Sequence, residues 1–235
     1  LHPKFSKPIA KEIHYYSVKY HMGKSWYLSN FLFQENGCFT GEASTSYLDY
    51  PQVPHRLKQD DLCDKFLVIF RNPVDRIVSN YNHMFERNQL RKKISLDLSI
   101  NEQLDTLEEV KGYLLNLALG KRKSEMDDIF FNDYYQFFIV RSLYPIFLKR
   151  WESIFEKENI HAVSFNNFVK NPQLILDEIF DFLNIDSYTP ENLESYKLNV
   201  GKKQHREISE ITLERLVNFL SPFNDILSQE YDINF

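Results

Sequence analysis

The sequence predicts an α/β fold in which helices flank a central, mostly parallel sheet. Residues 66–70 read Phe-Leu-Val-Ile-Phe, an unbroken apolar run that is typical of a strand buried on both faces. A helix signal follows at Pro73. A second inner strand is predicted at 161–165, followed by a helix signal at Asn171-Pro172. Strands that alternate with helices in this way are typical of a parallel sheet between helical layers.

The remaining elements follow from hydrophobic periodicity and from turn residues. Residues 11–17 are rich in strand-forming side chains, so we expect an extended segment there. Apolar positions at helical spacing predict a long amphipathic helix over 137–151. In chain order, the other predicted helices are a short one within 23–33, one at 51–57, one from 73 to about 87, pieces within the polar residues 87–122, one after 171 and one spanning 213–220.

Composition favours one globular domain. A chain of 235 residues with 43% hydrophobic content can bury one substantial core, so a single domain over 1–235 is predicted. The net charge of −5 argues against a general nucleic-acid binder and, more weakly, against a long polyanionic acceptor. No apolar run approaches the roughly 20 residues that span a bilayer, and no secretory signal is visible. Cys38 and Cys63 could pair, but the sequence favours two unpaired, buried thiols of a reducing compartment and hence a cytoplasmic location.

The turn after the strand at 66–70 carries the strongest functional signal. Arg71 stands where the strand ends, and Asn72 can cap the helix that follows. Ligands of open α/β sheets bind at this edge, and a guanidinium suits a phosphate. Ser79 lies off the apolar stripe of the helix, so its hydroxyl is available for a second contact. The alternative is that Arg71 pairs with a carboxylate and that Ser79 is simply solvated.

Four blocks of the chain resemble the sulfotransferases that use 3′-phosphoadenosine 5′-phosphosulfate (PAPS). The likeness is to the Golgi-type and bacterial branch, which includes the heparan sulfate sulfotransferase domains. Residues 11–16 (Lys-Glu-Ile-His-Tyr-Tyr) resemble its Lys-Glu-x-His-Phe-Phe block, and residues 41–47 resemble its Gly-Glu-x-(Ser/Thr)-Pro-x-Tyr block. Residues 71–81 resemble its Arg-Asp-Pro-x-x-Arg-x-x-Ser-x-Tyr block, and residues 142–172 resemble its tyrosine-tryptophan helix, inner strand and Asp-Pro turn. The blocks occur in the family's order.

This resemblance implies a P-loop, nucleotide-kinase-like sandwich and transfer of a sulfuryl group from PAPS, without a metal. The acceptor would be a hydroxyl or amine of a carbohydrate, a glycolipid or a small metabolite. Carried over by position, Arg71 and Ser79 would hold the 3′-phosphate of the nucleotide. The family's lysine-glycine loop over the cofactor would correspond loosely to Gly201, Lys202 and Lys203.

The resemblance also assigns catalytic roles to the block at 11–16. Glu12 would be the general base that takes the acceptor proton, and His14 would be its polar neighbour. Lys11 is a weaker candidate, as a donor to the leaving oxygen. In an extended segment, alternation would put Glu12 and His14 on one face and Lys11 on the other. Without the resemblance, Glu12 would be read as a surface carboxylate of an edge strand.

The chain departs from the family pattern in three places. The glycine-rich Lys-x-Gly-Thr loop that cradles the phosphosulfate is missing, and we expect it to precede residue 1. Ala43 and Ser44 stand where sugar-modifying relatives often have a lysine after the glutamate. Asn72 replaces an aspartate, a mild change because both residues cap helices well.

Two other functions remain open. One is a catalytically silent module that binds PAPS or adenosine 3′,5′-bisphosphate. The other is a nucleotide kinase-like phosphotransferase, which would need a Walker-type loop that the sequence does not contain. His and Cys do not cluster at ligand spacings, so no metal site is predicted.

Overall fold

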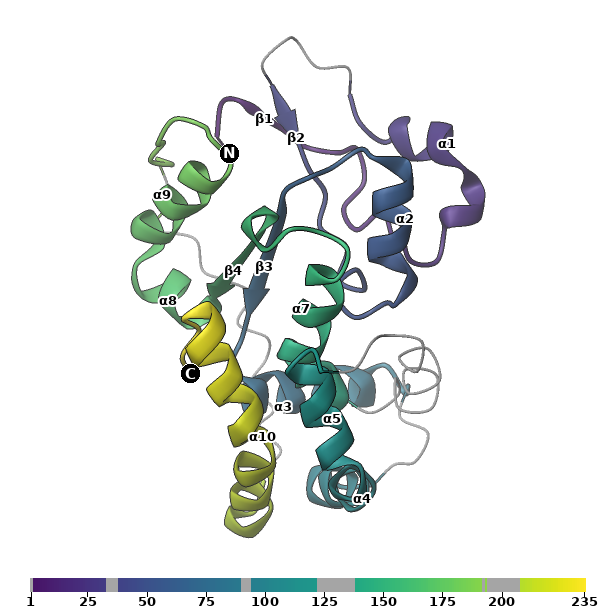
Figure 1. Cartoon of the computed structure of the whole chain (residues 1–235), viewed down its shortest axis with the longest axis vertical. Coiled ribbons are helices and arrows are strands. Elements are labelled where there is room, and N and C mark those ends of the chain that lie inside the picture. The colour runs from purple at the N-terminus through teal and green to yellow at the C-terminus, as the bar shows by residue number, and fades with distance from the viewer. Residues whose placement is uncertain (1, 33–37, 90–93, 122–137, 192, 194–207) are drawn as a thin grey trace.

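The structure is a computed structural model that describes residues 2–32, 38–89, 94–121, 138–191, 193 and 208–235 (Figure 1). Its strands are β1 (Phe5–Ser6), β2 (Phe39–Thr40), β3 (Phe66–Phe70) and β4 (Ile160–Ser164). The α-helices are α1 (Lys24–Leu28), α2 (Gln52–Asp60), α3 (Pro73–Glu86), α4 (Leu96–Glu109), α5 (Lys111–Ala118), α7 (Tyr144–Glu152), α8 (Phe165–Lys170), α9 (Pro172–Phe182) and α10 (Glu210–Tyr231). Short 3-10 helices are η1 (Tyr20–Met22), η3 (Val140–Ser142) and η4 (Lys157–Asn159).

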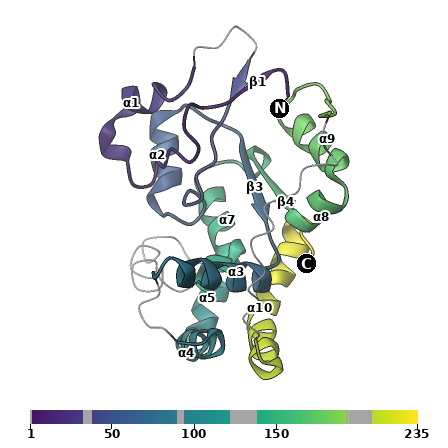
Figure 2. The ribbon, with the colours of Figure 1, turned by 180° about the vertical axis from the view of Figure 1, so that it is seen from behind.

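Both described strand pairs are parallel, as the sequence predicts. β3 pairs with β4 from Phe66↔Ile160 to Phe70↔Ser164, and β1 pairs with β2. The pair β3–β4 lies between the N-terminal part of the chain, with α1 and α2, and a helical end formed by α3, α4, α5 and α10 (Figures 1 and 2). The chain therefore has an α/β architecture. The pair β3–β4 lies between the N-terminal part and the purely helical part.

Helices cover the two faces of the strand pair unequally. Phe66 and Phe70 of β3 pack toward α7, and Val163 of β4 packs against α9. Leu67 and Ile69, on the α9 side of β3, are 41% and 49% exposed. The prediction that both faces of this strand are buried is therefore wrong for the described structure. The reason is that α8 and α9 pack over β4 rather than over β3.

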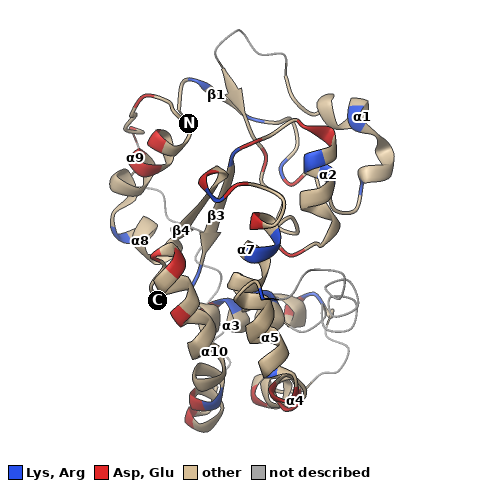
Figure 3. Ribbon diagram, viewed as in Figure 1, with Lys and Arg blue, Asp and Glu red and all other residues tan. Residues whose placement is uncertain are grey.

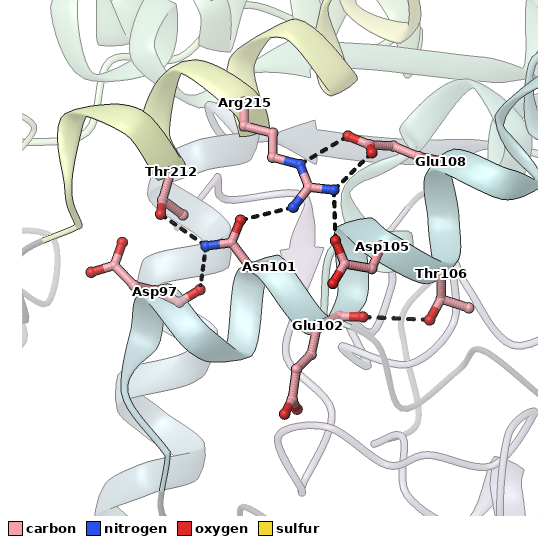
Figure 4. Close-up of polar contacts among 8 residues, drawn as sticks. All are labelled: Asp97, Asn101, Glu102, Asp105, Thr106, Glu108, Thr212 and Arg215. Atoms are coloured by element: carbon pink, nitrogen blue, oxygen red, sulfur yellow. Dashed lines mark hydrogen bonds and ion pairs between the residues drawn. The ribbon is translucent and has the colours of Figure 1, made fainter.

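The helical end is held by apolar packing and by a polar network between α4 and α10. Arg215 of α10 donates to Asp105 at 2.8 Å, to Glu108 at 2.7 Å and to Asn101 at 2.9 Å (Figure 4). Asn101 also donates to Thr212 at 3.0 Å. Acidic and basic residues are interspersed on helices such as α7 and α10 (Figure 3). The apolar side chains of α3, α4, α5, α7 and α10 pack together into the largest buried cluster described.

The predicted long helix over 137–151 is interrupted. The structure has the short helix η3, then a break at Leu143, then α7. Pro145 explains the break, because its ring lacks an N–H and would clash with the carbonyl of Arg141 in a continuous helix. Phe137, the first residue of the predicted helix, lies outside the described residues.

Residues 11–17 do not form the predicted extended segment. Glu12 and His14 both have φ of 57°, which is the left-handed region, and the chain makes a turn. Ile13, Tyr15 and Tyr16 are almost fully buried. The ring of Tyr15 stacks on the ring of Tyr27, with the two ring centroids 4.6 Å apart. Burial of these neighbouring side chains on one side requires a turn, because an extended strand would alternate their directions.

Two further expectations concern the cysteines and membrane helices. Cys38 and Cys63 are free, as expected, but both are exposed rather than buried. Within the described ranges, no helix combines the length and apolar character needed to cross a bilayer.

The stability of the fold should fall on mild acidification because of His161. Its ring stacks on Phe182 at 5.1 Å, and burial lowers the pKa of His161, an effect that Glu178 opposes. Below about pH 6.5 the unfolded chain binds a proton that the folded chain resists, so the free energy of unfolding decreases as pH falls. We expect His161→Phe to weaken this decrease between about pH 7.5 and 5.5, measured by urea unfolding. The control is His55→Phe at an exposed position of α2. An unchanged pH slope in His161→Phe would contradict the assignment.

Candidate active site

The turn at 11–17 brings together the predicted base and its neighbour. Glu12 Oε2 lies 3.5 Å from His14 Nε2, and both side chains are partly exposed. Left-handed φ values are uncommon for residues other than glycine and cost about 1–2 kcal/mol each. The two residues thus lie in one strained turn, with side chains that solvent can reach, while Ile13, Tyr15 and Tyr16 of the same turn are buried.

Lys11 lies beside the same carboxylate but points outward. Its Nζ is 4.0 Å from Glu12 Oε1, and its side chain is 88% exposed. An ion pair this open contributes little to stability. Lys11 therefore lies near the predicted base. Its side chain points to solvent, away from His14, because the backbone turns here and not because a strand alternates its side chains.

The loop at 41–50 binds the backbone of this turn. The Glu42 carboxylate accepts hydrogen bonds from Ser44 Oγ at 2.7 Å and from the Tyr47 hydroxyl. Ser44 Oγ in turn accepts from the backbone N–H of His14 at 2.8 Å, and the Tyr47 hydroxyl accepts from that of Tyr16 at 3.1 Å. Burial, and next the bond to Glu42, raise the pKa of Tyr47, so its hydroxyl remains a donor. Glu42 therefore organises the contact between loop and turn.

Two further contacts hold the turn from other directions. Arg56 Nη1 donates to the carbonyls of Tyr16 at 2.7 Å and Ser17 at 2.6 Å. His14 Nδ1 lies 3.1 Å from Ser46 Oγ, which donates to Ser17 Oγ at 2.8 Å. Hydrogen bonds to the backbone on both sides are what a strained turn needs in order to persist.

Arg71 lies at the β3–α3 corner, apart from this turn, and Ser79 lies further along, as the seventh residue of α3. Asn72 accepts from the backbone N–H groups of Val74 at 3.0 Å and Asp75 at 3.3 Å, which is the predicted N-cap. The Arg71 side chain is 46% exposed and its Nε lies 3.9 Å from Asp75. Ser79 is exposed on α3.

The corner presents an exposed cation on a supported backbone. Among the described residues, the guanidinium of Arg71 makes only a long, solvated contact with Asp75, so its donors can turn to an anion. Its backbone is fixed, because the Tyr144 hydroxyl donates to the Arg71 carbonyl at 2.9 Å. Burial raises the pKa of Tyr144 to about 12, which keeps this donor protonated. A rigid backbone with an available cation is suited to hold a phosphate.

A buried ion pair anchors the loop at 41–50 to the segment before α7. Asp49 is only 4% exposed and accepts from Arg141 Nε, while Arg150 donates to the Asp49 carbonyl at 3.3 Å. Burial raises the pKa of Asp49, and the charge of Arg141 opposes that shift. The loop that contacts the turn is thus tied to the same segment that supports Arg71.

Sequence reasoning missed several of these groups. It assigned no role to Glu42, Ser46, Arg56 or the Asp49–Arg141 pair. Two signals were available: Arg141 is a charged residue within an otherwise apolar stretch, and Glu42 and Ser46 lie within the family block at 41–47. The predicted cofactor residues Gly201, Lys202 and Lys203 lie outside the described residues, so their role stays a prediction.

Comparison with known proteins decides the family. Residues 42–213, well over half of the chain, match the family model of the sulfotransferase domain. The chain belongs to the sulfotransferase family. The chain is 22% identical, over 96% of its length, to the membrane-associated sulfotransferase kil1 of Dictyostelium discoideum. It is 25% identical, over 95% of its length, to the human heparan sulfate glucosamine 3-O-sulfotransferase 5.

The chain spans 59% and 64% of the lengths of these two relatives. Its fold is similar to the crystal structure of a sulfotransferase from Alicyclobacillus acidocaldarius, with a TM-score of 0.68 and 21% identity. That likeness covers 100% of this chain and 88% of the other. The predicted family is therefore confirmed, and the α/β fold is that of a sulfotransferase.

Replacing Asp49, and with it the buried contact to Arg141, should destabilise the protein markedly. Asp49→Asn removes the carboxylate charge that faces Arg141 Nε, and the loss of one partner from a buried pair costs on the order of 3 kcal/mol. Urea unfolding near neutral pH measures the change. The matched control is Asp61→Asn at an exposed helix end. A loss equal to that of the control would show that the pair is not structurally important.

Proposed function

We propose that this chain transfers a sulfuryl group from PAPS to a hydroxyl or amine of a carbohydrate, a glycolipid or a small metabolite. The observation that carries the proposal is the Glu12–His14 pair, 3.5 Å apart in a strained turn of a sulfotransferase-family chain. Strained backbone at a partly exposed carboxylate is typical of functional sites.

In the proposed reaction, Glu12 removes the proton of the acceptor group. The acceptor oxygen or nitrogen forms a bond to sulfur, while the bond between sulfur and the bridging oxygen breaks. The leaving phosphate of adenosine 3′,5′-bisphosphate keeps that electron pair. A carboxylate placed for this proton transfer contributes roughly 100- to 10,000-fold to the rate. Lys11 is the weaker candidate for a donor to the leaving oxygen.

The proposed nucleotide site is the β3–α3 corner. Arg71 and Ser79 would hold the 3′-phosphate through charge-assisted and hydroxyl hydrogen bonds. Gly201, Lys202 and Lys203 would contribute a loop over the cofactor. The same proposal includes a P-loop, nucleotide-kinase-like sandwich as the complete fold.

The names of the relatives support a glycan as acceptor, since one is a heparan sulfate glucosamine 3-O-sulfotransferase. The test is transfer of labelled sulfate from PAPS to a panel of glycans, glycolipids and hydroxylated metabolites. Transfer to one class identifies the acceptor. Tight binding of adenosine 3′,5′-bisphosphate without transfer to any class would instead indicate a silent binding module.

Replacing Arg71 should weaken nucleotide binding. Arg71→Ala removes a charged donor, and loss of a charge-assisted hydrogen bond corresponds to roughly 10- to 100-fold in affinity. Calorimetric titration with adenosine 3′,5′-bisphosphate measures the effect. Arg87→Ala, at the exposed end of α3, is the matched control and should bind normally. Unchanged affinity in Arg71→Ala would count against the proposed phosphate site.

Replacing Glu12 should separate catalysis from binding. Glu12→Gln keeps the size of the side chain but cannot take a proton, so the transfer rate should fall roughly 100- to 10,000-fold. Affinity for adenosine 3′,5′-bisphosphate should be unchanged. Glu156→Gln, an exposed glutamate before η4, serves as the control. Full turnover by Glu12→Gln would remove Glu12 from its proposed role.

A further inference from the structure

The imidazole of His14 has a polar neighbour at each nitrogen. Nε2 faces Glu12 Oε2 at 3.5 Å, and Nδ1 lies 3.1 Å from Ser46 Oγ. Ser46 Oγ donates to Ser17 Oγ at 2.8 Å, and Ser17 Oγ donates to the His14 carbonyl at 3.3 Å. Ser17 is only 3% exposed. The chain of hydroxyls therefore starts at the ring of His14 and returns to its own backbone.

The carbonyl at the end of this chain sets the direction of its donors. A carbonyl oxygen can only accept, so the Ser17 proton points to it and Ser17 Oγ accepts from Ser46. The proton of Ser46 is then committed, and its oxygen accepts from Nδ1–H. This order places the proton of a neutral imidazole on Nδ1 and leaves the lone pair of Nε2 toward Glu12.

We infer that Ser46 and Ser17 are positioning residues that make Nε2 of His14 the nitrogen that exchanges protons with Glu12. This inference rests on the proposed function. When Glu12 takes the proton from the acceptor, that proton can pass from the carboxyl oxygen to Nε2. The carboxylate is then restored, and the imidazolium that forms keeps its Nδ1–H bond to Ser46.

Neighbouring hydroxyls have different roles, which provides controls. Ser44 Oγ donates to Glu42 and accepts from the backbone, so it supports the turn rather than the ring. Thr45 is exposed. Removing the Thr45 hydroxyl should therefore leave the ring of His14 undisturbed, whereas removing that of Ser46 frees Nδ1.

The decisive experiment reads the tautomer of His14 and does not require transfer activity. The full chain is labelled with ¹⁵N-histidine, and the His14 signals are assigned by their loss in His14→Gln. Long-range proton–nitrogen spectra at about pH 8.5, where an ordinary imidazole is uncharged, should show the Nδ1–H tautomer in the wild type. Ser46→Ala should shift the nitrogen signals toward the other tautomer. Ser46→Thr, which keeps a hydroxyl, and Thr45→Ala should both give the nitrogen signals of the wild type. A wild type with the proton on Nε2, or no shift in Ser46→Ala, would overturn the inference.

The transfer assay then tests the link to catalysis. Loss of one hydrogen bond to the ring corresponds to up to about tenfold, so Ser46→Ala should lower kcat by about that factor and leave the KM for PAPS unchanged. Ser46→Thr should recover the rate. A tautomer shift in Ser46→Ala with an unchanged kcat would overturn the role of Ser46 in proton transfer. If the wild type shows no transfer, the proposed function fails, while the tautomer measurement still stands.

Discussion

The segment from Arg141 to Tyr144 is the part of the molecule on which the candidate site depends, because it contacts both of its halves. Arg141 pairs with the buried Asp49 in the loop that contacts the Glu12–His14 turn. On the other side, Ser142 accepts from Arg76 of α3 at 3.0 Å, and Tyr144 donates to the backbone before α3. Separating a buried ion pair leaves an uncompensated charge, so this link resists distortion. The turn and the β3–α3 corner are thus held by one rigid connection.

The turn itself combines local strain with strong support. Two residues in the left-handed region cost about 1–2 kcal/mol each. Hydrogen bonds from Arg56 to two carbonyls, and from two backbone N–H groups to the loop at 41–50, offset that cost. The buried rings of Tyr15 and Tyr16, which belong to this segment, anchor it in the core and keep it from relaxing. The result is a carboxylate and an imidazole whose geometry is set by their surroundings rather than by their own backbone preference.

The success of sequence reasoning varied with the range of the interactions involved. The start of α3 was predicted correctly because Asn72 and Pro73 act on their immediate neighbours. The long helix over 137–151 was predicted from periodicity, and the prediction failed at Pro145, whose effect on the backbone outweighs apolar spacing. The prediction of an extended segment at 11–17 was wrong for a different reason. Strand propensity is a weak preference that burial of aromatic side chains overrides.

The sequence by itself determined the strand–turn–helix at 66–86, the family and the identity of Glu12, His14 and Arg71 as candidate residues. These follow from local chemistry and from the order of motifs along the chain. Only the tertiary structure decided what surrounds them. Ser44 and Ser46 lie about thirty positions from His14, and Arg141 lies 92 positions from Asp49. Contacts over such separations depend on how helices and loops pack, and no local pattern of residues specifies that packing.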